Sequence, residues 1–136
     1  MIEIHEVLLA QICVNAERAY PNECCGLILG TSRHIKEIRP AENVSDDSRR
    51  NRYMVHPRDL MDAENYGRGI GMELTGVYHS HPDHPARPSA YDRETAIPQY
   101  IYLIVNVTQG RSGDVTCWRI ENWGSEFEPV ILHILR

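Results

Sequence analysis

The sequence lacks any uninterrupted apolar run of about 18 residues, so it offers no candidate membrane-spanning helix. Its first residues, 1–6, are acidic and lack the basic and apolar regions of a secretory signal peptide. Internal repeats and low-complexity stretches are also missing. These absences exclude membrane-spanning, fibrous and repeat proteins. They favour a single globular domain over residues 1–136, long enough to bury a core.

Cysteine is scarce and its spacing is wrong for a zinc finger or a redox motif. The four cysteines are Cys13, Cys24, Cys25 and Cys117, and no two form a Cys-x-x-Cys pair. Adjacent Cys24 and Cys25 do not readily bridge to each other. We therefore expect reduced thiols and a cytoplasmic protein. A thiolate from Cys24 or Cys25 could bind a metal, but burial is the commoner fate of cysteine, and their roles stay open.

Positive charge is also in short supply. The chain has 14 Lys and Arg against 19 Asp and Glu, a formal net charge of -5. A general nucleic-acid binder needs a basic face, so we expect no nucleic-acid partner. Arg49, Arg50 and Arg52 could still form a local basic patch.

Hydrophobic periodicity predicts interleaved helices and strands. Helical spacing occurs over residues 4–19, 56–67 and 89–96. Extended segments are predicted at 24–30, 34–39, 52–55, 72–78, 100–107, 115–120 and 127–135. We therefore expect an α/β fold, a single domain with a mixed β-sheet flanked by helices.

The stretch from Val77 to Asp92 carries the clearest chemical signal. His79 and His81 follow a buried strand in extended form, so both imidazoles point to one side and can reach one ion. Three prolines then force an irregular loop, and Ser89-x-x-Asp92 begins a helix. Two histidines and one carboxylate leave a fourth tetrahedral position for water, as in catalytic zinc sites. We predict one zinc per chain, bound by His79, His81 and Asp92.

Each part of this pattern has a simpler explanation when taken alone. Ser89-x-x-Asp92 could be only a capping box, and a lone His-x-His is more often solvated than ligated. The combined string is much rarer. It resembles the signature of the JAMM (MPN+) zinc metalloproteases, and Glu23, within Pro-Asn-Glu-Cys-Cys-Gly-Leu, resembles the upstream glutamate of the small prokaryotic Mec-type members. The resemblance implies a cytidine-deaminase-like JAMM/MPN fold.

The resemblance also implies two catalytic roles. Zinc lowers the pKa of bound water to about 7, and Glu23 would collect the proton as general base. Otherwise Glu23 would be a solvated glutamate after a Pro-Asn turn. Ser89 would donate a hydrogen bond to the oxyanion, typically worth about 2.7–4 kcal/mol, with or without serving as an N-cap. His84 lies between the ligands but is expected at the surface. The other histidines (His5, His34, His56 and His133) are expected to be structural or exposed.

The function implied by the resemblance is hydrolysis of an amide at the C-terminus of a ubiquitin-like sulfur-carrier protein with a Gly-Gly tail. The product would be cysteine or a short C-terminal peptide. Only seven residues separate Asp92 from Tyr100. They leave no room for the insertion with which related eukaryotic deubiquitinases grip polyubiquitin, so we expect little cleavage of polyubiquitin.

Three other classes were weighed against this hypothesis. Catalytically inactive MPN scaffolds lose metal ligands, whereas this chain retains them all. RadC-like proteins, linked to DNA repair, share part of the pattern but usually carry an extra N-terminal helical region. Zinc deaminases use His-x-Glu and Pro-Cys-x-x-Cys, and neither string occurs here. The carrier, the residue released and the oligomeric state stay open, as does the physiological metal, because such a site accepts other divalent ions.

Overall fold

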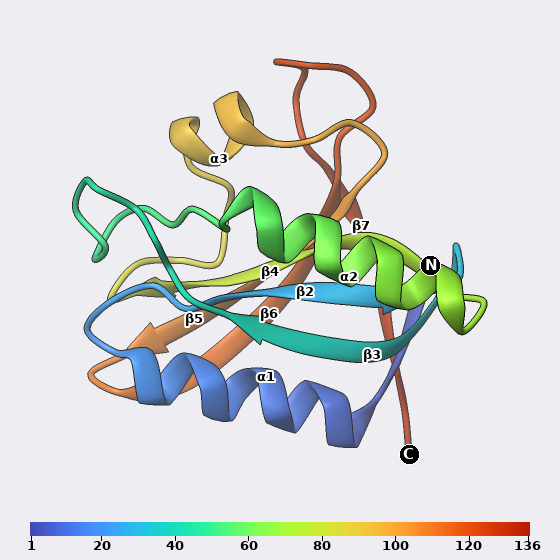
Figure 1. Cartoon of the computed structure of the whole chain (residues 1–136). Coiled ribbons are helices and arrows are strands. Elements are labelled where there is room, and N and C mark those ends of the chain that lie inside the picture. The colour runs from blue at the N-terminus through green and yellow to red at the C-terminus, as the bar shows by residue number, and fades with distance from the viewer.

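A computed structural model describes all 136 residues, and its centre is one eight-stranded sheet (Figure 1). The strand order is β7-β6-β5-β4-β2-β3-β1-β8. The pairs β1–β3, β1–β8 and β4–β5 are parallel and the others antiparallel, so the sheet is mixed, as predicted. The strands are β1 (Ile2–His5), β2 (Cys25–Gly30), β3 (His34–Ala41), β4 (Glu73–Pro82), β5 (Ile101–Thr108), β6 (Arg111–Arg119), β7 (Glu128–Val130) and β8 (Leu132–Leu135).

Helices cover both faces of the sheet. Helix α1 (Glu6–Ala19) lies against one face and α2 (Pro57–Gly69) against the other, while the short α3 (Ala90–Thr95) sits beyond α2 (Figure 1). Ile12 and Ala16 bury the inner side of α1 in the larger core cluster, and Ala63 does the same for α2 in a second cluster. None of the three helices has the length and apolarity that a membrane crossing requires.

The C-terminal segment joins the two ends of the sheet. Strand β7 pairs with β6 at one end of the strand order and β8 pairs with β1 at the other, with only Ile131 between them. The extended run predicted over 127–135 is therefore divided into two strands. Apolar spacing shows that a segment can be extended, but it does not show that its two halves have different partners.

Two sequence predictions were wrong in their boundaries or type. Ile4 belongs to β1 and not to the first helix, which begins at Glu6 because His5 caps it and accepts a hydrogen bond from the Val7 amide (3.1 Å). Segment 52–55 is extended but forms no strand. Its backbone groups bond to the side chain of Asn43 instead, through the Arg52 carbonyl and the Met54 amide (3.0 and 3.2 Å).

Candidate metal centre

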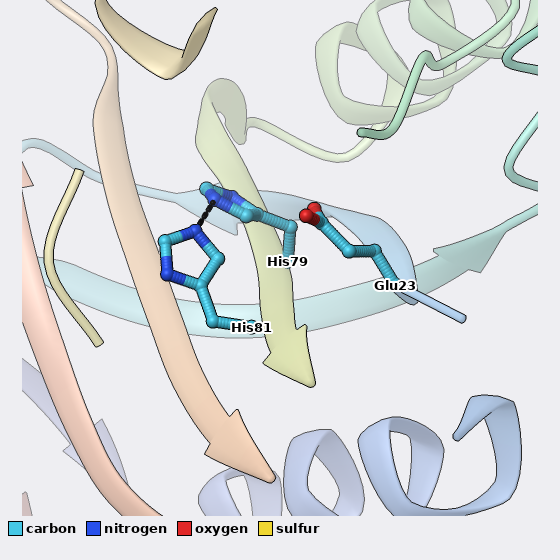
Figure 2. Close-up of side chains that lie close together, drawn as sticks. All are labelled: Glu23, His79 and His81. Atoms are coloured by element: carbon cyan, nitrogen blue, oxygen red, sulfur yellow. Dashed lines mark hydrogen bonds between the residues drawn. The ribbon is translucent and has the colours of Figure 1, made fainter. Parts of the chain in front are cut away.

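Strands β4 and β2 present three polar side chains to the α2 face of the sheet. Strand β4 runs through both histidines, so His79 and His81 share that face. The antiparallel register pairs Cys25 with His79, and Glu23 lies two residues before Cys25, just outside β2. Ligand atoms of Glu23, His79 and His81 lie within 4.8 Å of one another, and all three residues are buried (Figure 2).

Helix α3 adds a second carboxylate. Asp92 Oδ2 lies 3.1 Å from His81 Nε2 and 3.3 Å from His79 Nε2, and the two Nε2 atoms are 3.3 Å apart. Ligand atoms bound to one tetrahedral zinc at about 2.0–2.1 Å are separated by about 3.3–3.4 Å. The structure thus brings the predicted ligands His79, His81 and Asp92 together at a spacing that fits this ion.

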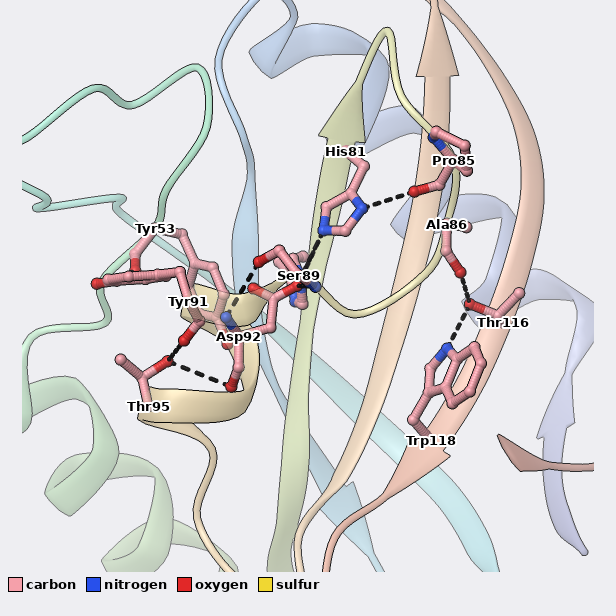
Figure 3. Close-up of polar contacts among 11 residues, drawn as sticks. Tyr53, His81, Pro85, Ala86, Ser89, Tyr91, Asp92, Thr95, Thr116 and Trp118 are labelled. Atoms are coloured by element: carbon pink, nitrogen blue, oxygen red, sulfur yellow. Dashed lines mark hydrogen bonds and ion pairs between the residues drawn. The ribbon is translucent and has the colours of Figure 1, made fainter. Parts of the chain in front are cut away.

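The loop between His81 and α3 is held by hydrogen bonds on both sides (Figure 3). His81 Nδ1 lies 2.7 Å from the Pro85 carbonyl oxygen and donates to it, which leaves the Nε2 lone pair directed at the site. The Ala86 carbonyl accepts a hydrogen bond from Thr116 Oγ1 (2.6 Å). The Asn106 side-chain amide donates to the His84 carbonyl (2.8 Å). These contacts fix the orientation of His81 and the path of the chain toward Asp92.

Ser89 holds Asp92 through a capping box at the start of α3. The Ser89 amide donates to Asp92 Oδ2 (2.9 Å), and the Asp92 amide donates to Ser89 Oγ (3.1 Å). Because Oγ acts as an acceptor in this box, its own O–H is left to donate elsewhere. Ser89 is half-buried, so the cap does not exclude a contact with substrate.

The pKa values of the Glu23 and Asp92 carboxyl groups are shifted in opposite directions. Burial acts to raise the pKa of Asp92, but the charge of His79 and hydrogen bonds from His79, His81 and the Ser89 amide outweigh it and hold that pKa below its usual range. Burial, followed by repulsion from Asp92, raises the pKa of Glu23 to about 9. Glu23 Oε1 and His79 Nδ1 are buried without a hydrogen-bond partner. Two carboxyl groups crowded against two imidazoles form a donor set that suits a divalent cation.

Aromatic rings pack on both imidazoles. Tyr53 stacks on His79 with ring centroids 4.4 Å apart, and His84 stacks on His81 at 4.1 Å. His84 had been expected at the surface but is half-buried, with Nδ1 lying 2.9 Å from the Pro82 carbonyl oxygen. Sequence reasoning missed Tyr53, because the extended segment predicted at 52–55 gives no signal for the partner of its side chains.

The two adjacent cysteines do not join the cluster. The Cys25 thiol lies near the carbonyl oxygens of Ala41 and Glu42 (3.8 and 3.6 Å). Burial raises the pKa of Cys24 to about 11 and that of Cys25 to about 12, so both are neutral thiols packed in the core. All four cysteines are free.

Comparison with known proteins points to one family. Residues 5–121 match the family of prokaryotic homologues of the JAB domain. The chain is 37% identical over 87 residues to desampylase of Haloferax volcanii, covering 62% of each protein. It is 33% identical over 97 residues to a probable TtuB-protein conjugate cleaving protease of Thermus thermophilus, covering 71% of this chain and 64% of that protein. The match thus spans less than two thirds of either relative.

Solved structures share the fold. A solution structure of a Desulfitobacterium hafniense protein, 28% identical, superimposes with a TM-score of 0.85 over 99% of this chain and 93% of that one. A JAB1/MPN domain protein from Archaeoglobus fulgidus, 21% identical, gives a TM-score of 0.61 over 100% and 98%. The protein has the JAB1/MPN fold and belongs to the prokaryotic JAB family, as a JAMM metalloprotease homologue with a buried Glu23, His79 and His81 group.

Proposed function

We propose that this protein is a zinc-dependent peptidase that hydrolyses the amide bond at the C-terminus of a ubiquitin-like protein. The observation that carries the proposal is the triangle of His79, His81 and Asp92 ligand atoms, with sides of 3.1–3.3 Å, beside the buried carboxyl of Glu23. The names of the two relatives, a desampylase and a TtuB-protein conjugate cleaving protease, support a conjugate as substrate.

In this proposal His79, His81 and Asp92 hold one zinc ion. Zinc bound there would polarise the scissile carbonyl and lower the pKa of water to about 7. Glu23 would take a proton from the attacking water and deliver it to the leaving amine. Its Oε1 has no hydrogen-bond partner and is free to make both transfers.

Ser89 would stabilise the charge that develops on the carbonyl oxygen. Its O–H donates to that oxygen while its Oγ continues to accept from the Asp92 amide. The same cap fixes the Asp92 carboxylate, so one residue would position a ligand and contribute to transition-state binding. A scaffold without activity would not need this arrangement of two carboxyl groups and a hydroxyl.

We further propose a sulfur-carrier protein with a Gly-Gly tail as the ubiquitin-like partner, and cysteine or a short peptide as the released group. Glycine has no Cβ to clash where an extended tail approaches a sheet. Only residues 96–100 connect α3 to β5, which leaves no insertion to grip a second ubiquitin. A RadC-like function is the alternative, but no basic excess in the chain favours nucleic acid.

The test is to offer three substrates at equal concentration to zinc-loaded protein: a carrier–cysteine adduct, a carrier joined to a lysine amine, and polyubiquitin. Intact mass identifies the products. We expect the carrier conjugates to be cleaved after the second glycine and polyubiquitin to stay largely intact. Rapid polyubiquitin cleavage beside an untouched carrier–cysteine adduct would overturn the substrate assignment. Glu23→Gln protein is the control for contaminating peptidases.

A further inference from the structure

A small apolar pocket adjoins the metal centre. Its volume is about 240 Å³, and eight of its nine lining residues are hydrophobic. Val77 of β4 and Tyr102 of β5, which are paired in register, form its floor, and Leu60 of α2 and Ile97 belong to its walls. Sites for drug-sized ligands measure about 300–1,000 Å³, so this pocket suits a single side chain.

Two lining residues connect the pocket to the metal centre. Tyr53 lines the pocket and also stacks on His79. Tyr91 lines the pocket and directly precedes Asp92 (Figure 3). A group bound in this pocket therefore lies beside the site of hydrolysis.

The spacing along β4 indicates which part of a tail would reach the pocket. Val77 and His79 are two residues apart on one strand, so they share a face of the sheet. The floor at Val77 lies roughly 7 Å along the strand from His79 and roughly 13 Å from His81, the length of two to four residues of extended peptide. With the scissile bond at the metal centre, two glycines span this distance and the residue before them lies over the pocket.

The polarity of the pocket determines what it can accept. The Tyr102 hydroxyl accepts a hydrogen bond from the Ile97 amide (2.7 Å), and the Tyr91 hydroxyl donates to the Tyr53 carbonyl (3.4 Å). The Tyr91 hydroxyl is thus occupied, most of the lining is aromatic or aliphatic, and no charged residue lines the pocket. An unpaired charge buried there would be costly. This disfavours the leaving side of the scissile bond when the leaving group is cysteine with its free carboxylate, and it favours an uncharged part of the tail.

We infer that this pocket binds an apolar side chain immediately upstream of the Gly-Gly tail, and that Leu60, Tyr91 and Ile97 determine specificity at that position. The inference rests on the proposed function, because it places the last peptide bond of the tail at the metal centre. It adds a requirement beyond two glycines: a tail ending Leu-Gly-Gly is a substrate, and one ending Asp-Gly-Gly is a poor one.

The experiment uses tail peptides of equal length ending X-Gly-Gly joined to a lysine amine, with X as Leu, Ala or Asp. Hydrolysis by zinc-loaded wild-type protein gives kcat/KM, and fluorescence anisotropy with zinc-loaded Glu23→Gln protein gives Kd. We expect kcat/KM to be higher and Kd to be lower for the Leu peptide than for the Asp peptide, each by about tenfold or more, as small changes in apolar contacts typically produce.

Substitutions at Leu60 test whether this pocket causes the preference for an apolar residue before the two glycines. Leu60→Phe narrows it and should weaken binding of the Leu peptide about tenfold while leaving the Ala peptide within about twofold. Leu60→Ala enlarges it and should shift the preference toward X as Phe. Met61→Phe is the matched control, since Met61 is the next residue of α2, is 63% exposed and does not line the pocket. A Tm for each variant confirms that it is folded.

The two readouts separate failure of the inference from failure of the proposed function. A binding preference for Leu without cleavage of any peptide would support the pocket and contradict the proposed chemistry. Cleavage with equal kcat/KM for Leu and Asp would overturn the pocket and leave the chemistry standing. Equal effects of Leu60→Phe on all peptides, or no binding to any of them, would also overturn it.

Discussion

At the scale of single residues, the most direct prediction concerns the proposed metal ligands His79, His81 and Asp92. Zinc content measured by inductively coupled plasma mass spectrometry should be about one per chain. The double substitution His79→Ala, His81→Ala should lose the metal and the activity together, because it removes two of three ligand atoms that lie 3.1–3.3 Å apart. His56→Ala is the control, an exposed histidine that caps α2. Full zinc occupancy in the double variant would refute the ligand assignment.

The effect of Glu23 on catalysis should be separable from zinc binding. Glu23→Gln keeps the shape of the side chain but removes its capacity to take a proton, so turnover should fall by about 10²–10⁴-fold while zinc content is unchanged. Paired zinc analysis and single-turnover kinetics measure the two effects. Near-normal kcat in this variant would assign the base to another group, and His84, which stacks on His81, would be the next residue to test.

Ser89 should affect kcat and not KM. Ser89→Ala removes a hydroxyl that is proposed to bind the oxyanion, which costs about 10²–10³-fold in kcat. It also removes a helix cap worth about 1 kcal/mol, so Tm should fall slightly while zinc is retained. Ser89→Thr keeps the hydroxyl and should restore most of both properties. A rise in KM with unchanged kcat would show that Ser89 only binds substrate.

The residues that the sequence could identify are those fixed by local geometry. Period-two alternation places His79 and His81 on one face, and a helix start places Ser89 beside Asp92, so spacing alone predicts their proximity. The involvement of Glu23 followed from the family resemblance, and the pairing of β2 with β4 brings its carboxylate within 4.8 Å of the ligand atoms of His79 and His81. Tyr53 could not be found in this way, because it reaches His79 from a loop far away in the sequence and no local spacing encodes that contact.

At the scale of elements, the loop between β3 and α2 is organised by one side chain. The Asn43 amide donates to the carbonyls of Glu23 and Arg52 (3.1 and 3.0 Å). Its Oδ1 accepts from the amides of Ser45 and Met54 (3.1 and 3.2 Å). One residue therefore links the backbone of the proposed base to the loop that carries Tyr53. The sequence predicted a strand over part of this loop. Its residue pattern indicates an extended conformation but does not show which groups the backbone hydrogen-bonds to.

Asn43→Ala should accordingly weaken both the fold and the reaction. It leaves several backbone groups without partners, so we expect a loss of about 1–3 kcal/mol in the free energy of unfolding. Zinc content should be unchanged, because no ligand lies in the loop, while kcat falls as Glu23 and Tyr53 lose their common support. Denaturant unfolding and steady-state kinetics measure these effects. Asn51→Ala, an exposed residue of the same loop, is the control. Unchanged stability in Asn43→Ala would contradict the role of this side chain.

At the scale of the whole molecule, the sheet is continuous from the metal centre to the C-terminal segment. Helix α1 and α2 cover its faces, and β7 and β8 occupy its two ends (Figure 1). The alternation of helices and strands predicted the mixed sheet, since each element has its own local pattern. The closure through Ile131 could not be predicted, because β8 pairs with β1 from the opposite end of the chain and no local spacing encodes that contact.

This closure predicts that stability and metal binding can be uncoupled. Deleting residues 132–136 removes β8 and exposes the edge of β1, where Ile2 and Ile4 are 2% and 0% exposed. Leu132 and Leu135 are half-buried, and losing their contacts should cost roughly 2 kcal/mol, or about 5–10 °C in Tm. The free edge should also promote association, detectable by light scattering. Zinc content should stay near one per chain, because β1, β3 and β2 separate β8 from the ligand strand β4.

Removing Arg136 alone, beyond the end of β8, is the control. An unchanged Tm in the deletion would mean that β8 contributes nothing to the sheet, whereas a loss of zinc in a folded deletion would mean that the metal centre depends on the closed sheet.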